Sequence, residues 1–494
     1  MRCFKNIFIL LLCSVTTFCF AQNHNRERMW VLPDSVGINF NTVTPTIFFS
    51  NESGCLSFGD GNPLEADASI SDTNGNLLFY SNGWKVYDRN NNLMPNGDSI
   101  WCGISTSNGI LTLPWPSRDS LYFLFYVNPY GLNNSAIGVY YSVVNMNLNG
   151  GNGAIENNMK NVKAYGVDSL YEQIAAIKHG NGRDWWLIGK RASGYFKILV
   201  NPEGIYDTSI QQIGLGLSEG ITVGEISVSK KGDKIASCLN ALGILEVLNF
   251  DRCNGHLSNF IFHDFLASFS NPISIYGCCF SPDGNNLYCT SSDTLFQLRI
   301  NGANLNITYK VICPSNIFSD IFAQLELAPN NIIYLTMCHG SAPSNNYSIY
   351  NMNLSTINSP DSIGASCDVQ LNSFNLGGKK TWLGLPNMPN YDLGRLVDSP
   401  CDTLYNSVNE KITNEKSIVR IYPNPATNEL TIEILNGIAP KKIEISNSLG
   451  VTVMQLHQTK PTAQLNIRQL AAGVYFVKVK MQDGSVTVRK FMKL

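Results

Sequence analysis

The chain has 494 residues, 35 Lys and Arg against 37 Asp and Glu, and a formal net charge of −2. This length exceeds one ordinary compact domain, and an apolar content of 44% allows a sizeable core, which excludes global disorder. The near-neutral charge, without basic blocks, argues against nucleic-acid binding and against a polybasic membrane-surface protein.

Residues 1–21 are predicted to form a cleaved secretory signal peptide, because a positive start and a short apolar run precede small residues. Cleavage is expected between Ala21 and Gln22. The apolar run is too short to span roughly 30 Å of hydrocarbon, and no later segment reaches the roughly 18 apolar residues of a spanning helix. A lipoprotein anchor is the alternative, because Cys13 and Cys19 lie here.

The remaining cysteines and the histidines show no spacing typical of a metal site. Eleven of the 14 cysteines lie beyond the signal peptide, and some are expected to pair in an oxidising compartment. The odd number leaves at least one free or paired between chains. No Cys-x-x-Cys, His-x-His or His-Glu-x-x-His pattern occurs, so we expect no metal and no cofactor.

Residues 22–397 have the pattern of an all-β domain. Short runs rich in Val, Ile, Leu, Tyr and Phe alternate with Gly, Asn, Asp and Pro, and no convincing amphipathic helix interrupts them. Six turn-then-strand units recur about 45 to 65 residues apart, near the period of WD-like or YVTN-like propeller blades. These units are residues 72–80, 118–124, 181–187, 229–236, 281–288 and 328–334.

A seventh unit is expected from the two ends of this domain. Residues 38–58 would pair with strands around residues 367–371, which closes the ring and removes open sheet edges. The prediction is therefore a seven-bladed β-propeller, and the alternative is a large sandwich array.

After a polar linker at 398–416, residues 417–494 are predicted to form a small β-sandwich. Alternating apolar residues predict strands at 430–434, 442–445, 474–479 and 485–489.

This C-terminal region resembles the sorting domain (type A) carried by cargo of the type IX secretion system of Gram-negative bacteria. The matching positions are Tyr422, Pro423, Asn424 and Pro425 in the opening motif, Gly473 and Tyr475 in a Leu-Ala-Ala-Gly-Val-Tyr-Phe segment, and Lys490 in the terminal Lys-Phe-Met-Lys-Leu. The resemblance implies passage through the periplasm, with the type IX machinery as partner, to the cell surface or the medium. It also implies that the tail is commonly removed and the protein released or anchored to lipopolysaccharide.

The preceding domain resembles, more loosely, propellers of secreted proteins that carry this tail. The matching residues are Trp30, 37–40 (Gly-Ile-Asn-Phe), 72–80, 94–97 (Met-Pro-Asn-Gly) and 385–387 (Leu-Pro-Asn). The chain departs from the pattern after Trp30, where Val-Leu-Pro replaces the usual Phe-Gly. The resemblance implies a fold and a location but no reaction.

Two short motifs resemble known catalytic or metal-binding motifs. Residues 216–220 (Gly-Leu-Ser-Glu-Gly) match the pattern of serine hydrolases, but a strand is expected after them instead of a helix, which favours a loop. Residues 72–76 resemble the opening of a calcium loop. Leu77 and Gly83 stand where an EF-hand needs Gly and Glu, which favours a β-turn.

Carboxylates precede or open several candidate inner strands, which line a common channel in a propeller. The candidate channel-mouth residues are Glu65, Asp67, Glu172, Glu225 and Glu326. Paired carboxylates suit glycoside hydrolysis, whereas hydrogen bonding to the backbone of neighbouring blades is the interpretation that we favour. The tryptophans Trp185, Trp186 and Trp382 are expected to stack on sugars or, more commonly, to pack between blades.

The predicted function is a secreted or cell-surface binding or adhesion module for a protein or glycan ligand, with no catalytic residue assigned. The alternative is an extracellular hydrolase or lyase that acts on polysaccharide with carboxylates at the channel mouth. A structural role in an adhesion layer is a third hypothesis.

Overall fold

The structure is a computed structural model of the chain. It describes residues 25–33, 35–50, 65–102, 106–129, 137–166, 170–215, 223–269, 273–312, 320–339, 349–404, 419–435, 437–447, 451–457, 460–482 and 486–494. The predicted signal peptide, including Ala21 and Gln22, and the motif at 216–220 lie outside the described residues. The chain divides into two compact units, Met1–Leu404 and Tyr405–Leu494.

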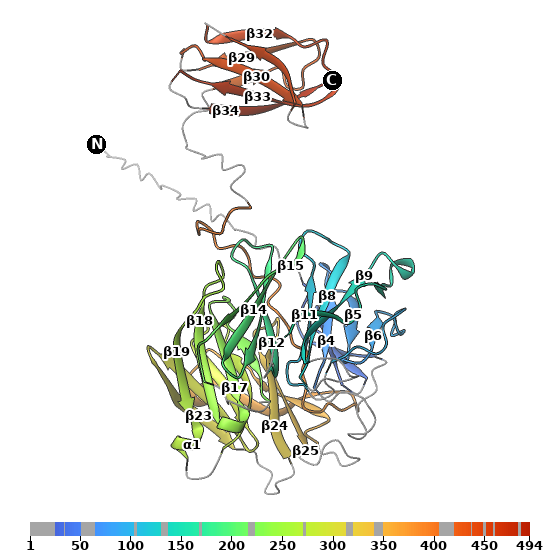
Figure 1. The fold of residues 1–494 in the computed structure, drawn as a ribbon, viewed down its shortest axis with the longest axis vertical. Helices are drawn as coiled ribbons and strands as arrows, with labels where there is room; N and C mark the ends of the chain where they lie inside the picture. The colour runs from blue at the N-terminus through green and yellow to red at the C-terminus, as the bar shows by residue number, and fades with distance from the viewer. Residues whose placement is uncertain are drawn as a thin grey trace, which may run out of the picture. The chain divides into compact units, whose positions relative to one another are not determined.

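The described part of the first unit contains seven antiparallel sheets, in which strands follow one another along the chain (Figure 1). The first three sheets comprise β1 (Met29–Leu32), β2 (Val36–Asn39) and β3 (Thr46–Phe49); β4 (Ala68–Ser71), β5 (Leu77–Ser81) and β6 (Val86–Asp88); and β7 (Ile110–Pro114), β8 (Leu121–Asn128), β9 (Gly138–Asn145), β10 (Ala154–Ile155) and β11 (Val162–Tyr165). The all-β prediction is confirmed.

The fourth to seventh sheets have four strands each. They comprise β12 (Leu170–Lys178), β13 (Trp185–Arg191), β14 (Gly194–Asn201) and β15 (Gly204–Gln211); β16 (Ile226–Val228), β17 (Lys234–Leu239), β18 (Ile244–Phe250) and β19 (Leu257–Asp264); β20 (Ile275–Phe280), β21 (Asn286–Ser291), β22 (Thr294–Asn301) and β23 (Asn304–Ile312); and β24 (Asp320–Leu327), β25 (Ile333–His339), β26 (Asn353–Ile357) and β27 (Val369–Asn375). One short helix, α1 (Phe265–Ser268), follows β19, and the Asp264 side chain accepts a hydrogen bond from Ala267 N at its start.

Each of the six predicted turns joins the first strand of a sheet to the second. The turn between β16 and β17 illustrates the cause: Ser229 N donates to Lys234 O, and Gly232 has a φ of +70°. A side chain at Gly232 would be strained by that φ, and its Cβ would lie 2.6 Å from Leu393 Cδ2. Local turn chemistry therefore sets where these hairpins form.

The seventh unit differs from the expectation. In the described strands, residues 38–49 pair within the first sheet, and β27 pairs with β26, so the two ends of the unit do not share a sheet. The turn before β2 lets the first three strands satisfy one another's hydrogen bonds. The first sheet instead packs side chains against the seventh, where the Trp30 and Phe40 rings lie 5.9 and 5.6 Å from the Tyr334 ring.

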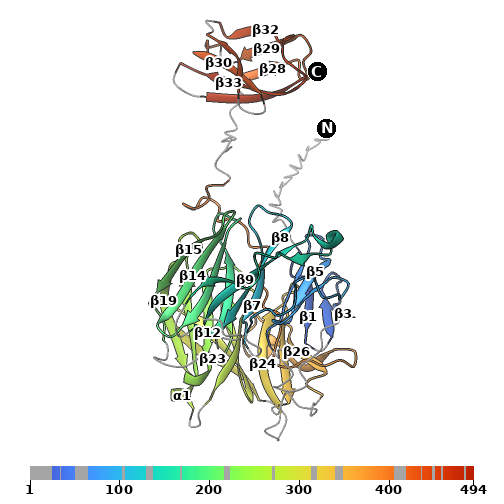
Figure 2. The ribbon, with the colours of Figure 1, turned by 45° about the vertical axis from the view of Figure 1, so that its right-hand side comes forward.

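The first strands of neighbouring sheets contact one another in chain order. Contacts join β1 to β4, β4 to β7, β7 to β12, β12 to β16, β16 to β20 and β20 to β24. In Figure 2, β7, β12 and β24 lie toward the middle of the unit, whereas β15 and β19 lie at its edge. Polar residues at the beginnings of the first strands are thereby brought close together.

Residues 390–404 belong to the first unit and are anchored to its sheets. Cys401 forms a disulfide with Cys253, and Arg395 Nη1 lies 2.7 Å from Asp402 Oδ2. The Arg252 guanidinium donates to Lys178 O at 2.8 Å and also to Gly394 O. Residues 398–404, expected to open the linker, are thus tied to this unit, and 405–416 lie outside the described residues.

The second unit has two described sheets with one shared core. They comprise β28 (Val419–Tyr422), β29 (Glu429–Ile434) and β32 (Thr462–Asn466); and β31 (Thr452–Leu456), β30 (Lys442–Asn447), β33 (Gly473–Lys480) and β34 (Val486–Lys493). Leu430 and Ile432 from one sheet belong to the same buried cluster as Ile445 and Val477 from the other. In the described part of the chain, no helix is long and apolar enough to span a membrane.

Candidate functional site

Two of the predicted carboxylates meet at one serine that precedes β7. Ser107 N donates to Glu172 Oε2 at 3.3 Å, and Ser107 Oγ donates to Glu65 Oε2 at 2.9 Å. The Tyr276 hydroxyl also donates to Glu65 Oε2, and burial, followed by the charge of Glu65, raises the pKa of Tyr276 well above its usual range. These residues lie in or just before the first strands of four different sheets, so the two carboxylates hold first strands together.

Glu225 precedes β16 and bridges two further sheets. Its Oε2 accepts hydrogen bonds from Cys278 N at 2.9 Å and from Leu325 N at 3.1 Å. Burial raises the pKa of Glu225 well above its usual range, although these two backbone bonds act in the opposite direction. Glu225 is therefore a buried hydrogen-bond acceptor between sheets.

The segment that follows β27 crosses between the first strands. Asn387 Nδ2 donates to Asn108 O at 3.0 Å and to Ile174 O at 2.8 Å, and Asn387 N donates to Asp67 O at 3.2 Å. Leu385 N donates to the Gln324 side chain at 2.7 Å. The Leu-Pro-Asn sequence at 385–387 is thus fixed by polar groups at or just before the first strands of four sheets, and Asp67 contributes its backbone carbonyl.

Replacing Asn387 by Leu should lower the free energy of unfolding by about 2 kcal/mol, because two buried carbonyl groups lose a donor. Urea unfolding followed by tryptophan fluorescence measures this loss. Asn390→Ala is the matched control: its side chain donates to Lys230 O at an exposed position, so a change below about 0.5 kcal/mol is expected. Equal effects of the two substitutions would contradict the role given to Asn387.

A cavity of about 100 Å³ lies beside this crossing. Its charged lining residues are Glu27, Glu225, Glu326 and Lys230. Its other lining includes residues 387–390 and β-strand residues from the fourth to seventh sheets. The structure therefore brings Glu225 and Glu326 to one cavity and Glu65 and Glu172 to one hydrogen-bond network. Asp67 is buried, and its backbone carbonyl accepts a hydrogen bond from Asn387 N.

Burial and neighbouring carboxylates raise the pKa of the cavity carboxylates. For Glu326, burial is the largest cause, followed by the charges of Glu225 and Glu27, and its pKa lies well above the usual range. For Glu27, burial and then the charge of Asp392 raise the pKa to about 7. At neutral pH the cavity consequently holds carboxyl groups that retain protons, which is an arrangement suited to hydrogen-bond donation.

The Glu27 pKa makes stability depend on pH. Because the folded-state pKa of about 7 exceeds the ordinary 4.5, the stabilising contribution is fully present below pH 4.5 and is lost as the pH rises through 7. The whole effect is at most about 3 kcal/mol, reduced by the partial exposure of Glu27. Glu27→Gln should therefore flatten the urea-unfolding free energy measured between pH 5 and pH 8.

The control for this pH series is Asp98→Asn. A hydrogen bond from Lys160 lowers the pKa of Asp98, so this group stabilises the fold above its ordinary pKa and loses that contribution as the pH falls. Because that loss occurs below the ordinary pKa of 3.8, Asp98→Asn should leave the slope between pH 5 and pH 8 unchanged. The same slope for wild type and Glu27→Gln would overturn the assignment.

The tryptophans proposed for sugar stacking are buried. Trp185 and Trp382 are each 1% exposed, and Trp186 is 5% exposed. The Trp185 ring packs edge-on against Tyr391 at 5.8 Å, and Lys178 Nζ lies 4.3 Å above its face. These rings therefore pack between elements of the fold, and the sugar-stacking expectation is wrong for them.

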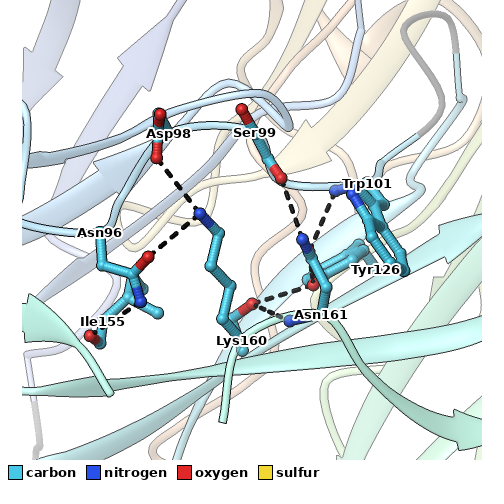
Figure 3. A network of polar contacts seen from close by, with 9 residues as sticks. Asn96, Asp98, Ser99, Trp101, Tyr126, Ile155, Lys160 and Asn161 are labelled. Atoms are coloured by element: carbon cyan, nitrogen blue, oxygen red, sulfur yellow. Dashed lines mark hydrogen bonds and ion pairs between the residues drawn. The ribbon is translucent and has the colours of Figure 1, made fainter. Parts of the chain in front are cut away.

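The Met-Pro-Asn-Gly loop that precedes β7 is held by a polar network (Figure 3). Lys160 Nζ donates to the Asn96 and Asp98 side chains at 3.2 Å each. The Asn161 side-chain oxygen accepts a hydrogen bond from the Tyr126 hydroxyl. All the contacts drawn in Figure 3 are between residues of this chain. Asn96 therefore serves to anchor the loop.

The sorting motifs of the second unit lie against one another. Asn424 Oδ1 accepts from Met492 N at 2.9 Å, and its Nδ2 donates to Lys490 O at 3.2 Å. Tyr475 stacks on Phe491 with ring centroids 5.6 Å apart. The opening Tyr-Pro-Asn-Pro motif and the last residues of the chain therefore form one structural feature, which explains why both ends of the domain carry sequence signals.

Glu27, Ser107, Asn108, Tyr276 and Asn387 are the residues that the sequence interpretation missed. Glu27 comes from the segment before β1, and Asn387 from the segment after β27, so neither lies on a strand whose periodicity marks it. The Leu-Pro-Asn motif was a usable signal for Asn387. Within the described residues, no group of His, Cys, Asp and Glu has the arrangement of a metal site.

Residues 420–493 match the family of the secretion system C-terminal sorting domain. No curated protein matches the chain. Among solved structures, PorZ, a surface component of the type-IX secretion system of Porphyromonas gingivalis, is 11% identical with a TM-score of 0.27, and the match covers 94% of this chain and 74% of PorZ. The Swd1 β-propeller domain of Myceliophteria thermophila is 10% identical with a TM-score of 0.37, covering 63% of this chain and 91% of that domain.

The C-terminal region is thus a type IX sorting domain, and such a domain indicates secretion to the cell surface or the extracellular space. The likeness to solved structures at these identities carries no argument about activity.

Proposed function

We propose that the protein is a β-propeller binding module that the type IX system delivers to the cell surface or the medium. The observation that carries the proposal is the sorting domain at residues 420–493. It makes the type IX machinery the first partner, and it makes a ligand outside the cell, a protein or a glycan, the second.

Three features support seven blades in the first unit. Consecutive strands pair in each of its seven described sheets, apart from β11, which pairs with β9. The first strands contact one another in sequence, and the first sheet packs on the seventh through Trp30, Phe40 and Tyr334. A ring closed in this way has no large open sheet edge. The shared core of the two sheets in the second unit supports a β-sandwich there.

The hydrogen bonds made by three of the predicted carboxylates favour a binding function over catalysis. Glu65, Glu172 and Glu225 accept hydrogen bonds from the protein itself, as expected for groups that connect sheets. The segment at 385–387 occupies the space between the first strands. A ligand would therefore meet the loops around the ring, in the manner of a rigid recognition surface.

The test is a binding screen with the mature full-length protein purified from culture medium. A glycan array and a panel of purified surface proteins are the probes, and saturable binding of at least one probe is the expected result. Absence of binding together with turnover of a polysaccharide would replace this proposal by the enzymatic one.

The enzymatic alternative rests on the cavity that contains Glu27, Glu225 and Glu326. Their raised pKa values supply protonated carboxyl groups near neutral pH, which is the requirement for a general acid in glycoside cleavage. This candidate predicts that Glu326→Gln abolishes polysaccharide turnover, because the amide cannot transfer a proton. Glu65→Gln, outside the cavity, is the control, and its turnover should persist in the folded variant.

A further inference from the structure

Three cysteines meet where the fifth and sixth sheets pack together. Cys238 lies on β17, and Cys278 and Cys289 lie on β20 and β21, where they are direct cross-strand partners. Each is at most 1% exposed. Cys238 Sγ lies 3.8 Å from Cys289 Sγ, so two sulfur atoms from different sheets are in contact.

The third thiol, Cys278, also has Cys238 as a side-chain hydrogen-bond partner. Cys278 Sγ donates to Glu225 O at 3.6 Å, whereas Cys238 Sγ donates to Gly277 O at 3.4 Å beside Cys289. The three cysteines share a buried cluster with apolar side chains such as Phe280. Burial raises the pKa of Cys238 and of Cys278, which keeps these thiols protonated and unreactive once the sheets have packed.

We propose that Cys238 and Cys289 form a disulfide that joins the fifth and sixth sheets, and that it is made while the protein folds after leaving the cytoplasm. The S–S bond forms as the two thiols lose two protons and two electrons. Those protons and electrons reduce the disulfide of a dithiol oxidase of the oxidising compartment to two thiols. Cys278 remains a thiol.

Geometry and compartment both support this pairing. The sulfur atoms need to approach from 3.8 Å to about 2.05 Å, a movement that side-chain rotation and small strand shifts supply. The sorting domain sends the chain through oxidising conditions, and the structure already contains the Cys253–Cys401 disulfide. Other described cysteines outside that disulfide are buried too, namely Cys102, Cys279, Cys338 and Cys367.

The proposal predicts two classes of disulfide that differ in accessibility. Cys253 and Cys401 are each partly exposed, so a reductant reaches their bond in the folded protein. The Cys238–Cys289 bond is enclosed by packed sheets and should resist the same reductant until the protein unfolds.

The experiment is thiol mapping of the mature full-length protein from culture medium. Alkylation in denaturant without reductant, then proteolysis and mass spectrometry, should yield one cross-linked peptide pair containing Cys238 and Cys289, with Cys278 alkylated. Prior treatment of the folded protein with reductant should open only the Cys253–Cys401 bond. Full alkylation of both Cys238 and Cys289 without reductant, or a Cys238–Cys278 bond, overturns the proposal.

A variant pair gives a second readout. Cys238→Ala and Cys278→Ala each remove one buried thiol, but only the first removes the proposed bond. In non-reducing buffer the urea midpoint of Cys238→Ala should fall clearly below that of Cys278→Ala. Equal midpoints for the two variants contradict a bond at Cys238. The peptide map of the wild-type protein decides the question even where a variant does not fold.

Discussion

Removal of Lys490–Leu494 will leave most of the protein in the periplasm and deplete the cell surface and the medium. These residues end β34 and contribute Phe491 to the core of the second unit, where it stacks on Tyr475. They also supply the backbone groups that bond to Asn424. The deletion therefore destroys the structure that both sorting motifs build, and a machinery that recognises the domain loses its target.

Cell fractionation with immunoblotting measures this outcome. Asn424→Ala tests the structural link between the motifs and should reduce export in part, since it removes two hydrogen bonds but no core residue. Lys460→Ala, at an exposed position away from both motifs, is the control and should be exported like the wild type. Unchanged surface display after deletion of the last five residues would contradict the sorting assignment.

Short-range signals in the sequence predicted the turns between the first two strands of six sheets and four strands of the second unit. The hairpin turns of the first unit depend on Gly, Asn and Asp at positions where the backbone needs them, and these positions are visible without knowledge of the fold. The pairing of the first three strands was not predictable in the same way. Residues 38–49 and the seventh sheet both offer apolar strands, and only the packing of Trp30 on Tyr334 distinguishes side-by-side sheets from a shared one.

The candidate site, too, was only partly predictable from the sequence. The position of Glu65, Glu172 and Glu225 at the beginnings of first strands follows from the repeat. That Glu225 lines the cavity whereas Glu65 and Glu172 meet at Ser107 depends on side-chain directions, and the repeat carries no such information. The segments before β1 and after β27 complete the site with Glu27 and Asn387, and their course is fixed only by tertiary contacts.

The observed disulfide could not be predicted from the spacing of cysteines along the sequence. Cys253 and Cys401 are separated by 148 residues, and an odd set of eleven cysteines allows many pairings. The bond exists because the segment after β27 returns to the turn that follows β18. Arg252 in that turn donates to Gly394 O in the returning segment and to Lys178 O at the end of β12.

Lys190→Met should lower the free energy of unfolding by about 3 to 5 kcal/mol, the largest stability effect that we expect in the first unit. Lys190 on β13 and Glu246 on β18 form an ion pair between the fourth and fifth sheets, and both side chains are 0% exposed. Glu246 also accepts from the Tyr195 hydroxyl and, at 2.9 Å, from Leu215 N. Removing the ammonium group leaves a buried carboxylate without its counter-charge.

Urea unfolding, followed by tryptophan fluorescence at neutral pH, measures the loss. Lys234→Met is the matched control, because Lys234 pairs with Asp233 at 3.3 Å in a largely solvated turn and should cost less than about 1 kcal/mol. The double variant Lys190→Met with Glu246→Gln should recover much of the lost stability, since no isolated charge remains inside the protein and the amide oxygen still accepts hydrogen bonds. A single Lys190→Met variant as stable as the control would show that the carboxylate is protonated or hydrated in the variant, and the ion pair would then have no role in holding the two sheets together.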